Sequence, residues 1–199
     1  MEPSSRAPQF VLASASPRRA ELLRQLGLVF TVRPCDIDER ALDHETAAET
    51  ATRLALAKAA IVARNETLPV LGADTIVVVD SVSLGKPRNS AEGLAMLERL
   101  SGRGHDVLTA VALVHAQRSE VRLSQSTVYF REISSDEARA YWRSREPRDK
   151  AGGYGIQGIG GIFARRIEGS YSGIVGLPLA ETEALLRAFG VDTWQYRGA

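Results

Sequence analysis

The chain has 199 residues, 44% of them hydrophobic, which is enough to bury one substantial core or two small lobes that share a cleft. Its 25 Lys and Arg residues against 24 Asp and Glu residues give a formal net charge of +1, which excludes nucleic-acid binding through the overall field of the protein. The single cysteine, Cys35, excludes an internal disulfide and multi-cysteine zinc motifs, and it favours a cytoplasmic location.

The chain carries no sign of a targeting or membrane segment. Residues 1–8 have neither a basic n-region nor a hydrophobic h-region, so we expect a flexible leader there. No apolar run approaches the roughly 18 residues needed to span a bilayer. With no internal repeat or low-complexity linker, residues 9–199 are expected to form a single domain.

The first predicted elements place hydroxyl and arginine side chains at the start of a helix. A short strand over 9–13 precedes Ser16, which is followed by a proline and is typical of an N-cap. Arg18 and Arg19 then lie in the first helical turn. Because a helix N-terminus presents unbonded N–H groups, these residues and Ser14 suit an anion cradle, with two ordinary solvated arginines as the alternative.

An acidic stretch follows the second predicted strand, over 29–33. Asp36, Asp38 and Glu39 offer hard oxygen ligands that suit magnesium or manganese. An acidic surface loop is an equally good interpretation of these residues.

A capping box predicts the next helix. Thr46 is followed three residues later by Glu49, and the helix is expected to run to about residue 64. Its inner face is predicted from the spacing of Ala51, Leu54, Lys58 and Ile61. Lys58 is the odd member, and the residues alone favour a stem lying along apolar surface with its amine in water.

Asp74 interrupts the almost wholly apolar strand predicted over 70–79. A carboxylate in such a strand loses hydration worth several kcal/mol unless a metal, a cation or a hydrogen-bond network replaces it. The cost suggests a functional site. The alternative is a carboxylate that caps a turn where the strand bends at Gly72.

Beyond this strand, helices and strands are interspersed. The pattern predicts a turn over 80–83 into a short strand, a helix over 90–100, a strand pair over 107–114 and 121–131, a helix opened by Ser134 and Glu137, a glycine-rich stretch over 151–161, a strand over 162–167 and a helix over 178–189. Because the elements do not alternate strictly, we expect a mixed, twisted α/β sheet flanked by helices.

Two glycine motifs imitate nucleotide-binding signatures. Residues 153–158 spell G-x-G-x-x-G but run into a predicted strand instead of opening a helix, so they are not a dinucleotide fingerprint. Gly85 and Lys86 are followed by Pro87, where a P-loop needs a hydroxyl. A rigid turn there could still aim Lys86 at a ligand, although solvated turn lysines are common.

Taken together and in order, the motifs closely resemble the Maf family of nucleoside triphosphate pyrophosphatases over about residues 10–189. The stretches that carry the resemblance are Leu12-Ala13-Ser14-Ala15-Ser16-Pro17-Arg18-Arg19, Gly72-Ala73-Asp74-Thr75, Gly85-Lys86-Pro87, residues 149–158, Gly169-Ser170-Tyr171 and Val175-Gly176-Leu177-Pro178-Leu179. The resemblance implies a two-lobed fold around a curved mixed sheet with a central cleft. It also implies a homodimer, a divalent cation, and hydrolysis between the α and β phosphates.

Within that family, the chain most resembles the subgroup that acts on dTTP and UTP. That subgroup has arginine, threonine and glutamine at the positions of Arg18, Thr75 and Gln157. A glutamine amide has one donor group and one acceptor, which can match O4 and N3–H of uracil or thymine. Cytosine reverses this pattern and requires a flipped amide, so discrimination by Gln157 alone should be modest.

The resemblance also implies a role for each candidate residue. Asp74 is expected to be the proton acceptor, a metal ligand or both, and Glu39 is the first choice for a further metal ligand. The residues expected to bind the substrate are Ser14, Ser16, Arg18, Arg19, Lys58, Thr75, Lys86 and Gln157.

Two other functional classes remain as alternatives. The family has been associated with septum formation, so a nucleotide-binding regulator of cell division without turnover is one of them. The intact Asp74 speaks against it, because a pure binder needs no base there. Nucleic-acid binding is the other, and the near-neutral charge argues against it; its candidate residues are Arg18, Arg19 and the group Arg143, Arg145 and Arg148. The physiological substrate, modified or unmodified, stays open.

Overall fold

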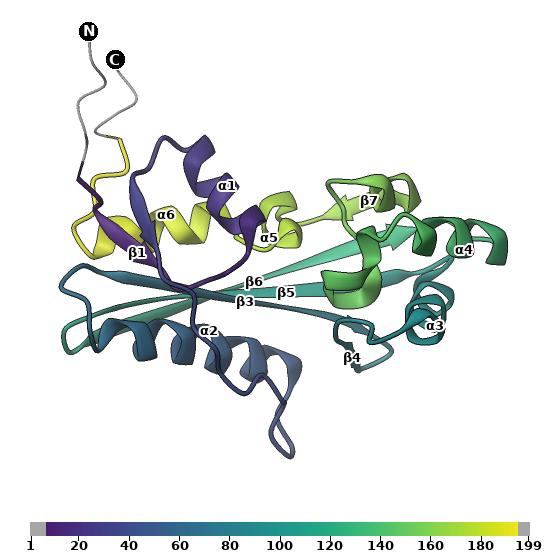
Figure 1. Ribbon diagram of the computed structural model, residues 1–199, viewed down its shortest axis with the longest axis horizontal. Coiled ribbons are helices and arrows are strands. Elements are labelled where there is room, and N and C mark those ends of the chain that lie inside the picture. The colour runs from purple at the N-terminus through teal and green to yellow at the C-terminus, as the bar shows by residue number, and fades with distance from the viewer. Residues whose placement is uncertain (1–6, 195–199) are drawn as a thin grey trace, which may run out of the picture. The chain divides into compact units, whose positions relative to one another are not determined.

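The computed structural model describes residues 7–194 and has a mixed α/β fold (Figure 1). The strands are β1 (Phe10–Leu12), β2 (Phe30–Val32), β3 (Val70–Val79), β4 (Val82–Leu84), β5 (Gly104–His115), β6 (Arg118–Phe130) and β7 (Ala164–Glu168). The helices are α1 (Pro17–Gln25), α2 (Ala47–Ala63), α3 (Ser90–Leu100), α4 (Ser135–Arg143), α5 (Tyr171–Val175) and α6 (Leu179–Ala188). Three short 3-10 helices are η1 (Glu146–Asp149), η2 (Ala151–Gly153) and η3 (Ile159–Phe163).

The strands form one mixed sheet, as the interspersed pattern predicts. Its order is β2-β1-β3-β5-β6-β7, with β4 paired to β3. Strand β1 is parallel to β2 and to β3, whereas β4 is antiparallel to β3 and β7 is antiparallel to β6. Asp80 and Ser81 both adopt positive φ, of 49° and 60°, which is the geometry of a tight turn between β3 and β4.

The chain divides into two compact units built from separated segments. Unit 1 comprises the chain up to Asp74, Ala110–Leu123 and the chain from Gly176, and unit 2 comprises Thr75–Thr109 and Ser124–Val175. The expected single domain over 9–199 and the cleft between two lobes stay predictions. The predicted leader falls largely on residues 1–6, outside the described part of the chain.

In unit 1, helices cover the strands on both sides. Figure 1 shows α2 on one side of the strands, with α1 and α6 on the other. The predicted capping box of α2 is present, because Thr46 Oγ1 accepts from the Glu49 N–H and the Glu49 side chain accepts from the Thr46 N–H. The buried face of α2 includes Leu54 and Lys58, but Ile61 is 39% exposed and its assignment to that face was wrong.

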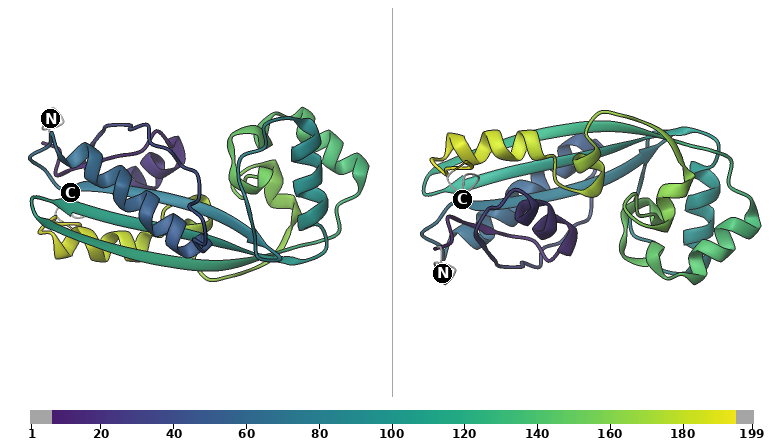
Figure 2. Two further views of the ribbon diagram at one scale, coloured as in Figure 1. Left: turned by 90° about the horizontal axis from the view of Figure 1, so that it is seen from below. Right: turned by 90° about the horizontal axis from the view of Figure 1, so that it is seen from above.

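In unit 2, an apolar cluster gathers side chains from the strands and from α3 and α4. Figure 2 shows α3 and α4 side by side. They approach closely because Gly93 of α3 has no side chain: a Cβ there would lie 2.2 Å from Cζ3 of Trp142 in α4. Helix α3 and the capping box of α4 are found as predicted.

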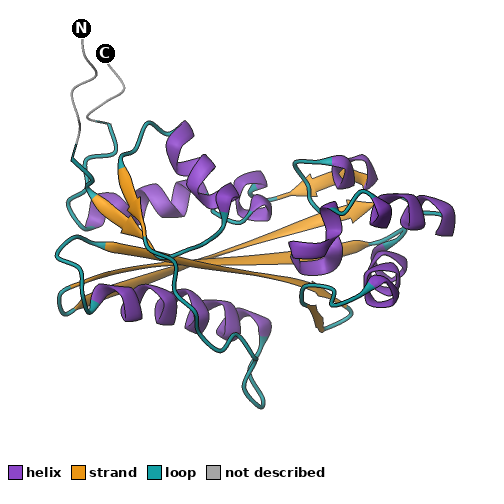
Figure 3. Cartoon of the chain, in the orientation of Figure 1, coloured by secondary structure: helices purple, strands orange, loops and turns teal. Residues whose placement is uncertain are grey.

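The glycine-rich stretch differs from its neighbours in backbone form. It contains the short 3-10 helices η2 and η3 rather than an α-helix, which agrees with the rejection of a dinucleotide fingerprint (Figure 3). The strand predicted over 162–167 begins only at Ala164, because Ile162 belongs to η3 and is 60% exposed. Within residues 7–194, no helix combines the length and the apolar character needed to cross a membrane.

Candidate active site

The loop between β1 and α1 is held by Ser14. This side chain is 7% exposed, and its Oγ accepts hydrogen bonds from the Ser16 N–H at 3.2 Å and from Nη1 of Arg19 at 3.1 Å. Ser16 occupies the predicted N-cap position, but its side chain makes no capping hydrogen bond to the helix. The serine hydroxyl that organises this helix start is therefore that of Ser14.

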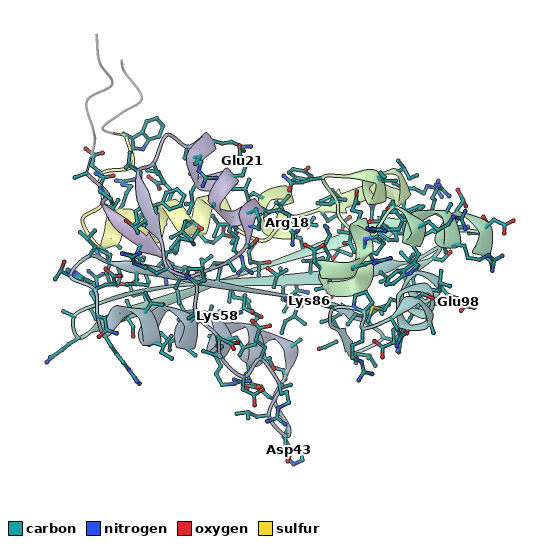
Figure 4. All side chains as sticks on the ribbon, in the orientation of Figure 1. Arg18, Glu21, Asp43, Lys58, Lys86 and Glu98 are labelled. Carbon is teal, nitrogen blue, oxygen red and sulfur yellow. The ribbon has the colours of Figure 1, made fainter. Side chains whose placement is uncertain are left out.

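Arg19 connects this loop to two other segments of unit 1. Its Nη1 donates to the Ala73 carbonyl at 2.7 Å, and its Nε donates to the Gly176 carbonyl at 2.9 Å. Burial lowers the pKa of Arg19, while the charge of Asp74 raises it, and a guanidinium remains protonated in either case. Arg19 thus places a positive charge beside the carbonyl that precedes Asp74. Arg18 lies one position earlier, at the start of α1 (Figure 4).

Close packing of α2 on β3 brings Lys58 to Asp74. A Cβ at Gly72 would lie only 2.3 Å from the Ala55 carbonyl oxygen of α2. Gly72 and Asp74 are two residues apart and therefore face the same side of the strand. Gly72 therefore allows the helix to approach the strand. The alternative interpretation, a strand bend at Gly72 with Asp74 capping a turn, is wrong, because β3 continues through both residues.

Lys58 lies between two carboxylates. Its Nζ is 2.7 Å from Oδ1 of Asp74 and 2.5 Å from Oε1 of Glu39, and both Lys58 and Asp74 are only 7% exposed. The expectation from the residues alone, an amine released into water, is wrong. Burial of Asp74 without a partner would cost several kcal/mol, and Lys58 supplies the compensating charge. We call these three residues the carboxylate–lysine cluster.

The other acidic residues near Glu39 serve the loop itself. Asp38 accepts several hydrogen bonds from Arg40, which lower the pKa of the Asp38 carboxyl to about 2. Glu45 pairs with Arg53 of α2 at 2.6 Å and 2.7 Å. Asp38 is thus engaged by Arg40, and Glu39 is the acid of this stretch that reaches the buried lysine.

The cluster fits a hard divalent cation in its donor chemistry. The carboxylates of Glu39 and Asp74 lie close together, because an oxygen of each is within 2.7 Å of the same Lys58 Nζ. No group of three or more His, Cys, Asp or Glu side chains within residues 7–194 forms a complete cage. Magnesium is commonly held by one or two carboxylates, with water and substrate phosphates as its other ligands, so two acids are sufficient for such a site.

In unit 2, Thr75 contacts a threonine that sequence reasoning missed. The Thr109 hydroxyl is 3.1 Å from the Thr75 hydroxyl and donates to the Gly173 carbonyl at 2.8 Å. Thr109 is fully buried in β5. The available signal was a hydroxyl inside an apolar run, comparable to the carboxylate of Asp74 in β3.

Lys86 and Gln157 are both exposed and lie outside the helices and strands of unit 2. Lys86 lies between β4 and α3 (Figure 4), and Gln157 lies in a turn closed by the Gly158 N–H, which donates to the Gly155 carbonyl at 3.2 Å. The Gly152 N–H donates to the Gly85 carbonyl at 3.0 Å and so joins the two segments. The catalytic and binding roles assigned to the candidate residues stay predictions.

Comparison with known proteins identifies the family. A family model described as Maf-like protein matches residues 9–189. A protein of Hahella chejuensis named dTTP/UTP pyrophosphatase is 52% identical over 190 residues, covering 94% of each chain, and a protein of the same name from Methylobacillus flagellatus is 52% identical over 183 residues, covering 90% of this chain and 92% of its own. A solved HAM1 protein of Coxiella burnetii is 21% identical, covering 62% of this chain and 73% of its own, with a TM-score of 0.46. The chain belongs to the Maf family.

Proposed function

We propose that the protein is a nucleoside triphosphate pyrophosphatase that hydrolyses dTTP and UTP to the nucleoside monophosphate and pyrophosphate. The observation that carries the proposal is the buried Asp74, paired with Lys58 and placed one residue after the carbonyl that Arg19 binds. The names of the relatives at 52% identity support the same activity and the same substrates.

The chemistry follows from the charges. A nucleoside triphosphate carries about four negative charges, so a water nucleophile can approach only where cations and backbone donors offset the field. Arg18, Arg19, Lys58 and Lys86 are the proposed cations. The N–H groups at the start of α1 are the proposed backbone donors.

Asp74 is the proposed proton acceptor. An ionised carboxylate has about four lone-pair sites, and the Lys58 ammonium occupies one of them at 2.7 Å. The remaining sites can accept a proton from water while Lys58 holds the side chain in place. Glu39 and Asp74 would hold a divalent cation, magnesium or manganese, which when bound neutralises phosphate charge.

Gln157 is the proposed reader of the base, with Thr75 as its partner in selectivity. The amide of Gln157 offers an acceptor to N3–H and a donor to O4 of uracil or thymine. The proposed compartment is the cytoplasm, which the single cysteine supports, and the proposed assembly is a homodimer, to be checked by sedimentation of the purified protein.

The test is pyrophosphate release from a panel of canonical and modified triphosphates, with magnesium, with manganese and with a chelator. We expect monophosphate and pyrophosphate as products, with kcat/KM for dTTP and UTP exceeding that for purine triphosphates by about tenfold or more. Release of orthophosphate instead would contradict the assigned bond. Tight nucleotide binding without turnover would favour a regulator.

A further inference from the structure

The Glu146 carboxylate is bound by the backbone of the glycine-rich segment, residues 151–161. Its Oε2 accepts from the Ile159 N–H at 2.8 Å, and its Oε1 accepts from the Gly160 N–H at 3.0 Å. Both carboxylate oxygens therefore accept hydrogen bonds from the backbone of the same short segment. Glu146 itself opens η1, directly after Arg145 with its positive φ of 69°.

Tyr141 of α4 extends this arrangement to the other end of the turn. Its hydroxyl donates to Oε1 of Glu146 at 2.7 Å and accepts from the Gly155 N–H at 3.0 Å. The two side chains thereby fix the amides of residues 155, 159 and 160. Gln157 lies between the fixed positions.

Protonation keeps the donor and acceptor roles distinct. Burial, together with the hydrogen bond to Glu146, raises the pKa of Tyr141, so the phenol keeps its proton. Burial raises the pKa of Glu146, but hydrogen bonds from the Gly160 N–H, the Tyr141 hydroxyl and the Ile159 N–H outweigh it and leave a net lowering. Near neutral pH the carboxylate is ionised, which strengthens every hydrogen bond it accepts.

The glycines of the segment are explained by this same approach. A Cβ at Gly158 would lie 2.2 Å from Oε2 of Glu146, and a Cβ at Gly160 would lie 2.5 Å from the Tyr141 hydroxyl. Only a residue without a side chain lets the carboxylate and the phenol reach the backbone. Glycine at positions 158 and 160 is therefore required by the approach of Glu146 and Tyr141.

From these contacts we infer that Glu146 is a positioning residue that sets the base selectivity of the enzyme by fixing the turn that carries Gln157. The inference rests on the proposed function, because it takes Gln157 as the reader of the pyrimidine. An exposed amide can discriminate O4 and N3–H from their reversed arrangement in cytosine only if its backbone is held in place. Glu146 needs no contact with substrate for this role.

The experiment compares Glu146→Gln and Tyr141→Phe with Glu132→Gln, an exposed glutamate of unit 2 that serves as the matched control. Kinetics with dTTP and dCTP give kcat and KM separately, and hydrogen exchange reports the amides of residues 155–160. Gln157→Glu is the reference variant, because it changes the side chain that is proposed to recognise the base. Circular dichroism and thermal melting show whether each variant is folded.

For Glu146→Gln we expect the dTTP-to-dCTP ratio of kcat/KM to fall about tenfold, mainly through a higher KM for dTTP, because an amide can accept at only one of its two ends. Tyr141→Phe should shift the ratio in the same direction by a smaller factor. In both variants the amides of 155, 159 and 160 should exchange faster. Glu132→Gln should match the wild type in every readout.

Several results would overturn the inference, and they can be told apart. If the wild type discriminates and Gln157→Glu loses that discrimination, but folded Glu146→Gln and Tyr141→Phe both keep the wild-type ratio, then Glu146 does not position the reader. If the wild type releases no pyrophosphate from dTTP, the proposed function fails and this inference fails with it. If the wild type turns over dTTP but does not discriminate against dCTP, the inference fails and the proposed function stands. A general loss of stability with an unchanged ratio would assign Glu146 to the fold alone.

Discussion

Asp74 in unit 1 is buried and Glu146 in unit 2 is half-buried, and different groups compensate the two carboxylates. Asp74 meets the buried ammonium of Lys58, whereas Glu146 meets two backbone N–H groups and a phenol. A side-chain cation can exchange partners during a reaction, while backbone donors move only with their loop. The kind of partner therefore separates an acid suited to a catalytic role, which pairs with a side-chain cation, from an acid that holds a loop in place through backbone N–H groups.

The sharpest test of this difference is Asp74→Asn. The amide keeps the size of the side chain but removes the proposed proton acceptor, so we expect pyrophosphate release to fall by about 10²–10⁴-fold with the fold retained. Steady-state turnover of dTTP and circular dichroism would check it. Wild-type turnover in this variant would remove Asp74 from the chemistry and break the contrast with Glu146.

The second test removes the partner and leaves the acid. Lys58→Met should lower the free energy of unfolding by about 3 kcal/mol, because Asp74 is then buried without a compensating charge. Urea unfolding measures the change. Lys86→Met, at an exposed lysine, is the control for stability and should differ little from the wild type. Equal midpoints for the two variants would show that Asp74 needs no cation.

The third test addresses the packing that brings Lys58 to Asp74. Gly72→Ala places a Cβ 2.3 Å from the Ala55 carbonyl oxygen, a backbone atom that cannot rotate away. We expect the free energy of unfolding, measured with urea, to fall by about 3 kcal/mol, which is the upper part of the usual range for overpacking. At Gly85 a Cβ meets nothing within 4 Å, so Gly85→Ala should have almost no effect.

The smallest expected effect concerns a buried base of unit 2 rather than a buried acid. Burial lowers the pKa of His105 from 6.5 to about 4, and its Nε2 lies 2.8 Å from the Tyr154 hydroxyl. Between these two pKa values the unfolded chain binds the extra proton, so stability is complete above pH 6.5 and is lost as pH falls toward 4. From pH 6.5 to 5 the loss should be about 2 kcal/mol.

Urea midpoints measured across this pH range would check the His105 prediction. His105→Gln should flatten the pH dependence, since the group that takes up the proton is gone. A wild-type midpoint that stays constant from pH 6.5 to 5 would show that the imidazole reaches solvent more easily than its 2% exposure indicates.

Helix starts were predicted well from the sequence where the residues that determine them lie close together in the chain. The capping boxes at Thr46 and Ser134 are written in residues three positions apart, and both helices begin where predicted. The strand expected from residue 162 was wrong by two positions, because residues 159–163 form η3, whose first two N–H groups bind the side chain of Glu146.

The candidate site shows the same limit. Asp74 could be singled out because a charged residue within an apolar run can be recognised from the sequence alone. Its partner could not be chosen, since the pairing with Lys58 depends on the packing of α2 against Gly72. Thr109 and Glu146 were missed because a threonine in a strand and a glutamate before a proline are ordinary in sequence. Only their hydrogen-bond partners, dozens of residues away or on backbone atoms, make them distinctive.

The bond from Arg19 to the Gly176 carbonyl spans 157 positions of the chain. A ribosome releases the amino end first, so the first helix has emerged long before the segment that anchors its arginine is made. Unit 1 can be completed only after translation has passed residue 176. A nascent or prematurely terminated product therefore lacks the Arg19 contact that completes the loop between β1 and α1, and catalytic competence should appear only near the end of synthesis.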